Sequence, residues 1–382
     1  MTITERLMGV GAWSLDLDPA TPQSVLQGLR LRDAGRGHLV VFPTWVDAAA
    51  LDDEDALALA RYTGIYLKQD RSTLTLSGMG VNGWLGDGKR GRSTQQATTR
   101  TFEGWTTFVT PDYLGTGIRS TIAGNFKVDT GPVFFNDLAN LIADRYGAAW
   151  RVTNDFKLDF GTYAALFRES PTALITRHTA DSGRDFDVHG VTGDLELVED
   201  IEDWARRVVY WYEDESSGPT AIIQDGGVDP GDAPFRGPDG SAAFVDVLVE
   251  DSETDNATDA TALSLAQWGR FRGVRQEISL SSTEYDIGRD IGVGDNLFVF
   301  DHDRGIYDMG NPVTYRGQVI YPDVIRCVGY SWPVRAGMGV WFRRHRKVDS
   351  SWVLEWTDLT PYVRWETGAA TVDVGAKPRA MT

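Results

Sequence analysis

The chain has 382 residues, of which 42% are hydrophobic and 11% aromatic, so it can bury sizeable cores and is not disordered throughout. Its formal net charge is −18, which argues against a protein that grips nucleic acid through a broad basic surface. The length predicts about two or three domains, and 41 glycines with 13 tryptophans favour a β-rich architecture with many turns.

The cysteine content and the hydropathy pattern indicate the cellular compartment in which the chain is made. Cys327 is the sole cysteine, so no intrachain disulfide can form and stability has to come from cores or from assembly. Residues 1–10 contain no apolar segment of the kind found in secretion signals, and no run approaches the roughly 18 apolar residues of a membrane span. We therefore expect a protein made in a cytoplasm, without stable membrane insertion.

The first predicted domain covers residues 1–87 and is β-rich. Alternation of apolar and polar side chains, or a short apolar run between turns, predicts strands at residues 12–17, 25–32, 38–42, 61–68 and 72–78. The acidic segment 51–57 is expected to be a loop or one helical turn. Residues 88–114 are weakly patterned and rich in Thr, Arg and Gly, so we expect a loop or an extended arm there.

Residues 115–200 are predicted to form a peripheral α+β domain. Its helix is predicted at residues 133–148, where apolar side chains recur at helical spacing and Gly147 stands where a C-terminal cap is needed. The members of this apolar face are Phe134, Leu138, Leu141, Ile142 and Tyr146. Strands are expected at residues 149–152, 157–160, 173–178 and 186–191.

A second β-domain is predicted over residues 201–334. Two strands, at residues 204–212 and 244–249, are separated by a long acidic loop rich in Gly and Pro at 213–240. A helix is predicted at residues 258–271. Asp259 lies in its first turn, where the positive end of the helix dipole favours a carboxylate.

Residues 274–320, within this second domain, are predicted to form a small antiparallel barrel. Three strand-like runs are separated by glycines, which permit the positive φ of a tight corner between strands. The runs are 274–285, 296–301 and 315–320, and the glycines are Gly288, Gly292, Gly294, Gly305 and Gly310. Because no helix follows these glycines, they do not indicate a cofactor-binding loop. Residues 335–382 are expected to be a C-terminal β extension with strands at 340–342, 352–356, 362–365 and 370–374.

Two acidic segments are candidate metal sites. Residues 301–305 (DHDRG) resemble a fragment of a calcium loop but lack its later glutamate, and the same residues are common in hairpin turns. Residues 225–239 offer carboxylates for a metal or form a solvated acidic loop. The histidines show no zinc-binding spacing; they are His38, His178, His189, His302 and His345. We predict no metal and no cofactor.

No catalytic constellation stands out in the sequence. There is no Gly-x-Ser-x-Gly elbow, Cys327 lies in an apolar strand typical of an inert thiol, and the glycines at 78–83 lack the Gly-Lys-Ser/Thr of a phosphate-binding loop. No spacing singles out a carboxylate pair for glycoside hydrolysis. The basic run 343–347 suits a nucleic acid, an acidic neighbour or a solvated face. We predict no catalytic residues and a protein that is not an enzyme.

Four stretches, taken in their order along the chain, carry a family resemblance. They are residues 11–17 (GAWSLDL), 74–85 (LTLSGMGVNGWL), the helix 258–271 leading into a strand at 275–280, and 293–299 (VGDNLFV). In this order the chain resembles the baseplate hub or tail-tip (minor tail) proteins of long-tailed bacteriophages of the siphophage type. The four stretches together span most of residues 9–330.

The resemblance implies an α+β, mostly β fold with two antiparallel barrels like those of tail-tube proteins, at residues 12–76 and 274–320. Three copies would then present six barrels as a ring that joins a six-fold tail tube to a three-fold tip. The implied partners are two further copies of the chain, a distal tail or tail-tube protein, a tail fibre or spike and the tape-measure protein. The implied location is the distal end of the virion tail, where DNA would pass through the ring without specific binding.

Two other functions remain open from the sequence. A carbohydrate-binding or receptor-binding β-protein would use exposed tryptophans as stacking platforms, although tryptophan is more often a core residue. The candidates are Trp204, Trp211, Trp332, Trp341 and Trp352. A cell-wall hydrolase is the other alternative, and it lacks any nominated acid, nucleophile or metal.

Overall fold

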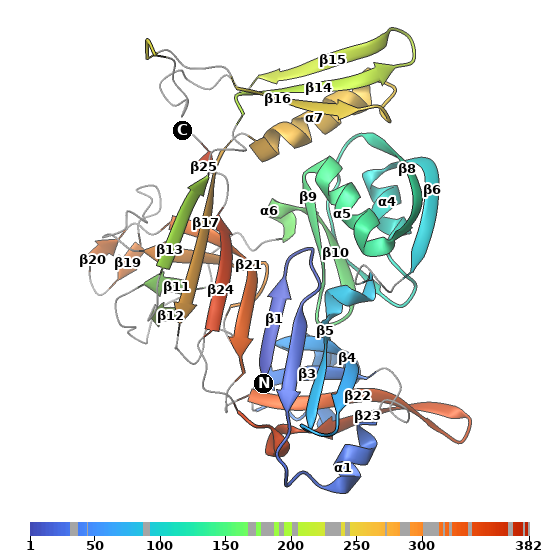
Figure 1. Ribbon diagram of the computed structural model, residues 1–382, viewed down its shortest axis with the longest axis vertical. Coiled ribbons are helices and arrows are strands. Elements are labelled where there is room, and N and C mark those ends of the chain that lie inside the picture. The colour runs from blue at the N-terminus through green and yellow to red at the C-terminus, as the bar shows by residue number, and fades with distance from the viewer. Residues whose placement is uncertain are drawn as a thin grey trace.

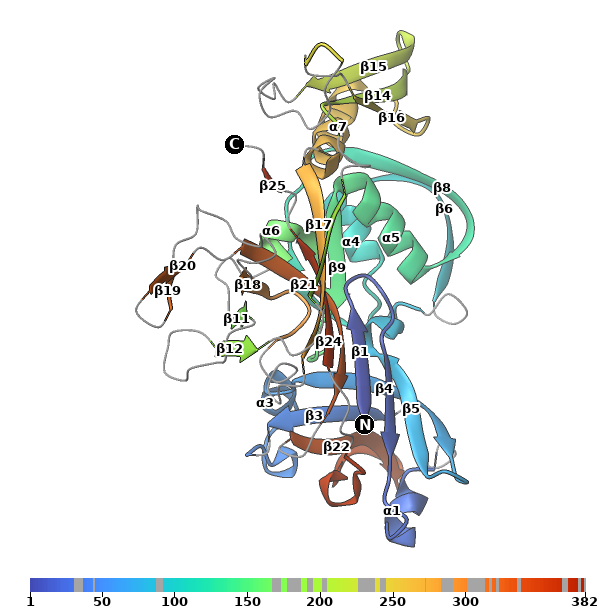
Figure 2. The same cartoon turned by 60° about the vertical axis from the view of Figure 1, so that its left-hand side comes forward.

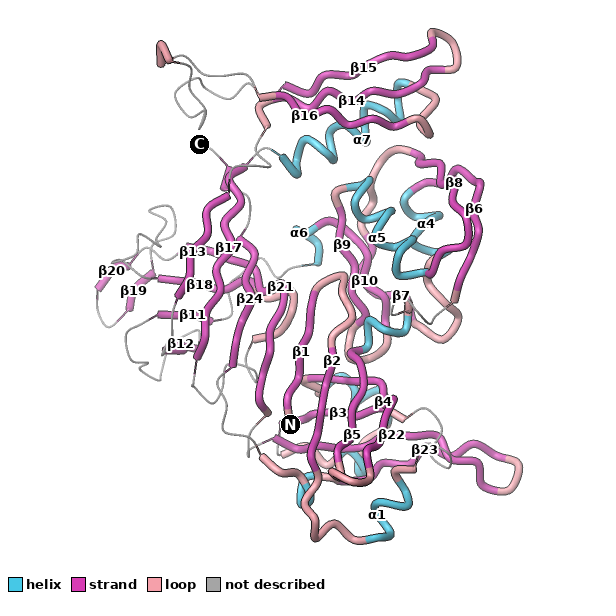
Figure 3. The backbone as a smooth tube through the Cα atoms, viewed as in Figure 1, coloured by secondary structure: helices cyan, strands magenta, loops and turns pink. Residues whose placement is uncertain are grey.

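The computed structural model is built mainly from strands, which Figure 3 shows in magenta. It describes residues 1–30, 37–43, 45–86, 92–166, 173–176, 187–190, 195–200, 205–225, 238–240, 245–271, 273–282, 291–300, 313–315, 318–320, 323–334, 338–365, 370–376 and 379–380. Within these ranges no helix has the length and apolar character needed to span a membrane. The α+β, mostly β fold class predicted from the sequence is confirmed.

One sheet of 15 strands runs through the molecule, and its first half combines both ends of the chain (Figure 1). Its neighbouring strands, all antiparallel, are in order β1 (Thr2–Arg6), β2 (Ala12–Asp16), β5 (Thr75–Gly80), β4 (Tyr62–Asp70), β3 (His38–Pro43), β22 (Met338–Val348) and β23 (Ser351–Asp358). β22 and β23 come from the segment expected to be a C-terminal extension. They complete the N-terminal half of the sheet.

The second half of this sheet is organised around β21 (Asp323–Pro333), which pairs with β1. One branch continues from β21 through β24 (Ala370–Ala376) and β17 (Gly273–Ser282) to β13 (Leu195–Asp200) and β25 (Arg379–Ala380). The other branch consists of β18 (Asn296–Phe300), β11 (Ala173–Thr176) and β12 (Asp187–Gly190). β19 (Val313–Tyr315) and β20 (Gln318–Ile320) form a separate hairpin. Figure 2 shows β17, β24 and β21 beside β1.

The two closed barrels expected at residues 12–76 and 274–320 are not found among the described strands. Both β regions are instead parts of one sheet, because β1 pairs with β2 along one edge and with β21 along the other. A strand has only two edges, so this pairing leaves β1 no free edge with which to close the N-terminal half on itself. The main hydrophobic core is continuous across the join, from Ile3 and Trp13 to Leu297 and Trp332.

One predicted strand in the N-terminal half is a helix. The strand expected at residues 25–32 is replaced by α1 (Gln23–Gly28). Val25, Leu26 and Leu29 also fit helical spacing, and all three pack against the main core. In the acidic segment 51–57 the expected helical turn is confirmed as α3 (Asp53–Ala58), which follows the short η1 (Ala48–Ala50).

A second core lies beside the large sheet and is built around α5 (Phe135–Tyr146), which confirms the helix predicted there. Gly147 ends it with φ of 57°, the left-handed conformation expected of a glycine cap. A sheet of β7 (Gly115–Arg119), β10 (Lys157–Thr162) and β9 (Ala148–Val152) packs with it. The remaining elements of this unit are η2 (Val81–Trp84) and α6 (Tyr163–Leu166).

The loop or arm expected at residues 88–114 contains regular structure. β6 (Ser93–Thr101) pairs with β8 (Asn125–Phe134) as a long antiparallel ribbon, and α4 (Phe102–Phe108) follows it. Thr101 caps this helix by accepting a hydrogen bond from the Gly104 backbone N–H at 3.0 Å. The threonines of β6 suit a strand because they are β-branched. The segment has no alternation of apolar and polar residues, so its sequence does not predict a strand.

A three-stranded sheet forms the far end of the molecule, with β14 (Arg207–Asp214) between β15 (Gly218–Asp225) and β16 (Asp246–Asp251) (Figure 1). The start of the loop expected at 213–240 is therefore a hairpin and a strand. The predicted helix is confirmed as α7 (Ala257–Phe271), which covers one face of this sheet. η4 (Thr360–Tyr362) completes the described elements.

Candidate assembly interface

Two groups of exposed apolar side chains on strands of the described chain are candidate interfaces. The first is the tip of the β22–β23 hairpin, here called the hairpin tip (residues 345–353). β3 pairs with β22 only between Met338 and Arg343, so the strand beyond Arg343 has β23 as its sole partner among the described strands. Trp352 is 68% exposed there and Val353 48%. The hairpin thus projects past the edge of the sheet (Figure 1).

Two buried arginines hold the base of this hairpin. Arg343 makes two hydrogen bonds to the carboxylate of Asp53, at 2.7 and 2.5 Å, and its guanidinium lies 5.4 Å from the ring centre of Phe156. Arg344 donates two bonds to Glu355 Oε2, at 3.1 and 2.8 Å, and a third to the Gly28 carbonyl. Charge-assisted bonds of this kind are strong and directional, so the base of the hairpin is fixed.

The basic run 343–347 is therefore divided between interior and surface. Arg343 and Arg344 are buried and engaged, whereas His345, Arg346 and Lys347 are exposed on the hairpin tip. The Glu355 carboxylate lies 3.9 Å from Arg346 and offsets part of its positive charge. The interpretations offered from the sequence, an acidic neighbour, a nucleic acid or a solvated face, apply to the last three residues alone.

The second candidate interface is the face of the three-stranded sheet that points away from α7, here called the sheet patch (Val209, Trp211, Ile223 and Leu248). Side chains alternate along β14, so Tyr210 and Tyr212 pack into the second core while Val209 and Trp211 point outwards. Val209 stands directly opposite both Ile223 and Leu248 in the register. Ile223 is 56% and Leu248 58% exposed.

Acidic side chains border the sheet patch. Glu213 follows Trp211 by two positions, and Glu250 lies opposite Trp211 on β16, so both share its face and are exposed. In the adjoining turn, hydrogen bonds from Ser216 and Ser217 lower the pKa of Asp214 to about 2. That carboxylate is therefore ionised at neutral pH. Arg207 lies on the same face and is ion-paired with Asp246. The sheet patch therefore combines an apolar centre with a rim on which acidic side chains outnumber basic ones.

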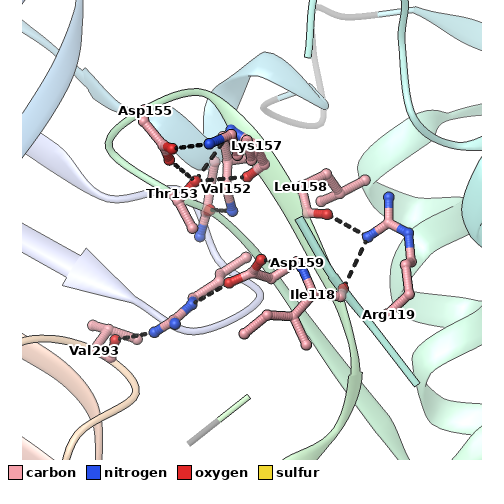
Figure 4. A network of polar contacts seen from close by, with 11 residues as sticks. Ile118, Arg119, Val152, Thr153, Asp155, Lys157, Leu158, Asp159 and Val293 are labelled. Atoms are coloured by element: carbon pink, nitrogen blue, oxygen red, sulfur yellow. Dashed lines mark hydrogen bonds and ion pairs between the residues drawn. The ribbon is translucent and has the colours of Figure 1, made fainter. Parts of the chain in front are cut away.

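Polar contacts fix the second core to the large sheet, which sets the positions of these surfaces. Arg151 on β9 is bonded to Asp159 Oδ2 at 3.1 Å and donates to the Val293 carbonyl at 2.5 Å. Figure 4 labels these two partners, Asp159 and Val293. Asp159 is buried and also accepts a bond from the Ile118 N–H at 2.7 Å. Arg151 thus connects the second core to the corner that leads into β18.

The glycine corner predicted at residues 292–295 is confirmed in part. Gly294 has φ of 101°, whereas Gly292 does not adopt positive φ and donates its N–H to Asp295 Oδ2 at 2.8 Å. A Cβ on Gly294 would lie 1.9 Å from the Arg151 guanidinium, so this glycine is also needed for the close approach of Arg151. Gly288, Gly305 and Gly310 lie outside the described residues.

Asn82 provides a second connection between the two cores. Its side-chain N–H groups donate to the carbonyls of Arg6 and Gly9, at 3.0 and 2.9 Å. Its Oδ1 accepts a bond from the Val152 N–H at 2.7 Å. One amide therefore links the β1–β2 turn to β9.

A partly buried carboxylate lies at the join between the two halves of the large sheet. Glu5 stands opposite Tyr330 in the β1–β21 register, and the Tyr330 hydroxyl donates to Glu5 Oε2 at 2.5 Å. Burial raises the pKa of Glu5, against the opposing effects of the Tyr330 hydrogen bond and the charge of Arg151. Burial also raises the pKa of Tyr330 and of Tyr62, and the Glu5 charge adds to both shifts. Ionisation of Glu5 therefore affects the stability of the pairing between β1 and β21.

The candidate metal segments fall mainly outside the described part of the chain. Residues 301–305 and 226–237 are not described, and Asp225 lies in β15, 3.7 Å from Arg206. Across the described ranges no group of three or more His, Cys, Asp or Glu side chains could hold a metal ion. His38 is buried, and its burial, followed by the charge of Arg343, lowers its pKa to about 3.

Cys327 and the candidate tryptophans differ in their burial. Cys327 is fully buried on β21, with its sulfur 3.7 Å from the Gly329 carbonyl. Trp332 is buried in the main core and Trp341 packs against a small core beside β3, whereas Trp211 and Trp352 are exposed on separate surfaces. Trp204 lies outside the described residues. The structure does not bring the described tryptophans together as one stacking platform.

Comparisons with known proteins give matches among solved structures. Over its whole length, the chain is similar to phage tail proteins. A tail protein from Neisseria meningitidis MC58 has 13% identity and a TM-score of 0.48, with 98% of each chain covered. The 43 kDa tail protein of prophage MuSo2 from Shewanella oneidensis has 11% identity and a TM-score of 0.47, covering 100% of this chain and 94% of that one. A prophage tail protein from Listeria monocytogenes EGD-e has 10% identity and a TM-score of 0.48, covering 99% and 88%.

No family model matches the sequence, and no curated protein matches it. The identities to these solved structures are 10–13%, and the TM-scores are 0.47–0.48.

Proposed function

We propose that this protein is a non-enzymatic structural subunit of a bacteriophage tail or baseplate, and that three copies form a hub between the tail tube and a three-fold tip or fibre. The β1–β21 join is the observation that carries the proposal. It holds two β regions from distant parts of the chain in one sheet with a shared core. Three copies would present six such regions, which matches a six-fold tube to a three-fold tip.

Ring closure would also complete the β regions. Neither half closes into a barrel among the described strands, and the described path of the large sheet ends at β12 and β23. Open sheet edges and exposed apolar faces favour association, and a closed ring of copies covers both. In this proposal the tube-like character predicted from the sequence resemblance belongs to the assembled ring rather than to one chain.

The charge of the chain suits a channel for DNA. With a net charge of −18, a ring of these subunits would repel the phosphate backbone and let DNA pass without adhering. The neighbours in this proposal are a tail-tube or distal tail protein on one side and a fibre or spike on the other, with the tape-measure protein inside. The location is the distal end of the virion tail, at the site of genome delivery.

Mass measurement in solution by light scattering tests the proposal. We expect a species of about 127 kDa, three times the 42.2 kDa chain, and three copies per particle in a reconstruction of intact virions. A chain that stays monomeric at all concentrations and is also found in another copy number in the particle would refute the hub.

A further inference from the structure

We propose that the hairpin tip of one copy docks on the sheet patch of the next copy. This inference rests on the proposed trimeric hub and names the surfaces through which the copies meet. Both surfaces are apolar and are left exposed by the described part of the chain, and they differ in the charge around them. Trp352 and Lys347 occupy the hairpin tip, and Trp211 and Glu250 occupy the sheet patch.

The hairpin tip has the features of a segment that is completed by a partner. Directly opposed residues share a face of an antiparallel pair, so Trp352 lies with Lys347 on one face and Val353 with Arg346 on the other. All four are exposed, and a two-stranded ribbon with both faces in water is marginally stable. The strands beyond Arg343 extend about 16 Å at the usual rise per residue, which is enough to reach across a subunit boundary.

Charge complementarity selects a second copy of this chain as the partner. Arg346, Lys347 and His345 surround the apolar residues of the tip, with Asp349 in the turn and Glu355 held by the arginines. The sheet patch is bordered by Glu213 and Glu250, and Arg207 on the same face is already paired with Asp246. A basic apolar tip therefore has an acidic apolar counterpart within the same sequence.

The placement of the two surfaces favours a ring. They lie at opposite ends of the molecule (Figure 1). The hairpin tip of a copy would contact the next copy's sheet patch rather than its own hairpin, which makes the contact heterologous. Heterologous contacts repeat from copy to copy and close when the rotation between copies is a whole fraction of a turn. Three copies related by a third of a turn would use every tip and every patch once.

Engineered cysteines test the contact directly. Trp352→Cys places a thiol on the tip and Leu248→Cys places one on the patch, while the buried Cys327 is shielded from competing. Under mild oxidation the double variant should give covalent dimers and trimers, with trimer as the largest product. Each single variant alone should stay uncross-linked on a non-reducing gel, and a mixture of the two single variants should give dimers and nothing larger.

Substitutions provide a second readout with a matched control. Trp352→Ala should raise the concentration at which the trimer dissociates by about tenfold or more, as for a buried aromatic at an interface. Trp45→Ala is the control, because Trp45 is 73% exposed and lies outside both surfaces. Lys347→Glu and Glu250→Lys should each weaken the trimer, and the two together should restore much of the loss.

The outcomes separate this inference from the hub proposal. If the wild-type chain is trimeric but the double-cysteine variant does not cross-link and Trp352→Ala behaves like Trp45→Ala, the docking is wrong and the hub proposal stands. If the wild-type chain is monomeric in solution and is not trimeric in the particle, both fail.

Discussion

At the scale of single residues, the ionisation state of Glu5 affects the pairing that joins the two halves of the large sheet. Its carboxylate is partly buried between strands from opposite ends of the chain and accepts a bond from Tyr330 at 2.5 Å. Burial disfavours the ionised form and raises the pKa of Glu5 above its ordinary value. The free energy of holding β1 against β21 therefore depends on pH.

We predict that the free energy of unfolding of the wild-type protein falls as pH rises, and that Glu5→Gln abolishes this fall. Because the folded-state pKa is raised, the unfolded chain releases this proton first, and between the two pKa values the folded protein binds more protons. The wild-type free energy of unfolding should therefore fall from about pH 4.5 upwards, through the raised pKa, relative to the variant. Urea unfolding at several pH values between 4 and 7.5 measures this difference. A difference that does not change with pH would contradict the assignment.

At the scale of secondary-structure elements, helix ends are placed by residues that can be recognised in advance. α5 ends at Gly147, which has φ of 57°. A Cβ at this position would lie 2.9 Å from the Ala266 carbonyl of α7. The same glycine therefore caps one helix and permits the close approach of another.

Gly147→Ala is expected to lower the free energy of unfolding by about 1–2 kcal/mol, because it adds left-handed strain and crowds α7. Gly131→Ala is a suitable comparison, since a Cβ there meets nothing within 4 Å and its φ is not positive. Thermal unfolding of both variants measures the difference. Equal melting temperatures for the two would contradict the role of Gly147.

At the scale of the whole molecule, Arg151 connects the second core to the large sheet. Its guanidinium bonds to the buried Asp159 and to the Val293 carbonyl, and it lies against the backbone of Gly294. The corner it contacts is itself held by the Gly294 N–H, which donates to the Cys327 carbonyl at 3.0 Å. Removing Arg151 should loosen this connection between the two cores.

We predict that Arg151→Met lowers the free energy of unfolding by about 2–4 kcal/mol, because it leaves the Asp159 charge buried without its ion-pair partner. The double variant Arg151→Met, Asp159→Asn should recover part of the stability. In both variants, amide hydrogen exchange of residues 291–297 should be faster than in the wild type, since neither retains the bond to Val293. Unchanged exchange there would show that Arg151 does not hold the corner.

The sequence by itself determined the elements that depend on residues close together in the chain. The helices α5 and α7, the Gly147 cap, the Gly294 corner and most strands of the first β region follow from periodicity and glycine positions. Tertiary structure decided the rest, including α1 in place of a strand, the pairing of β6 with β8, and the burial of Arg343 and Arg344. It also decided that β1 pairs with β21 and that the two halves form one sheet rather than two barrels. A strand carries its own alternation but no label for its partner, and pairings such as Ile3 with Trp332 depend on which distant edges and apolar faces are free when the chain packs.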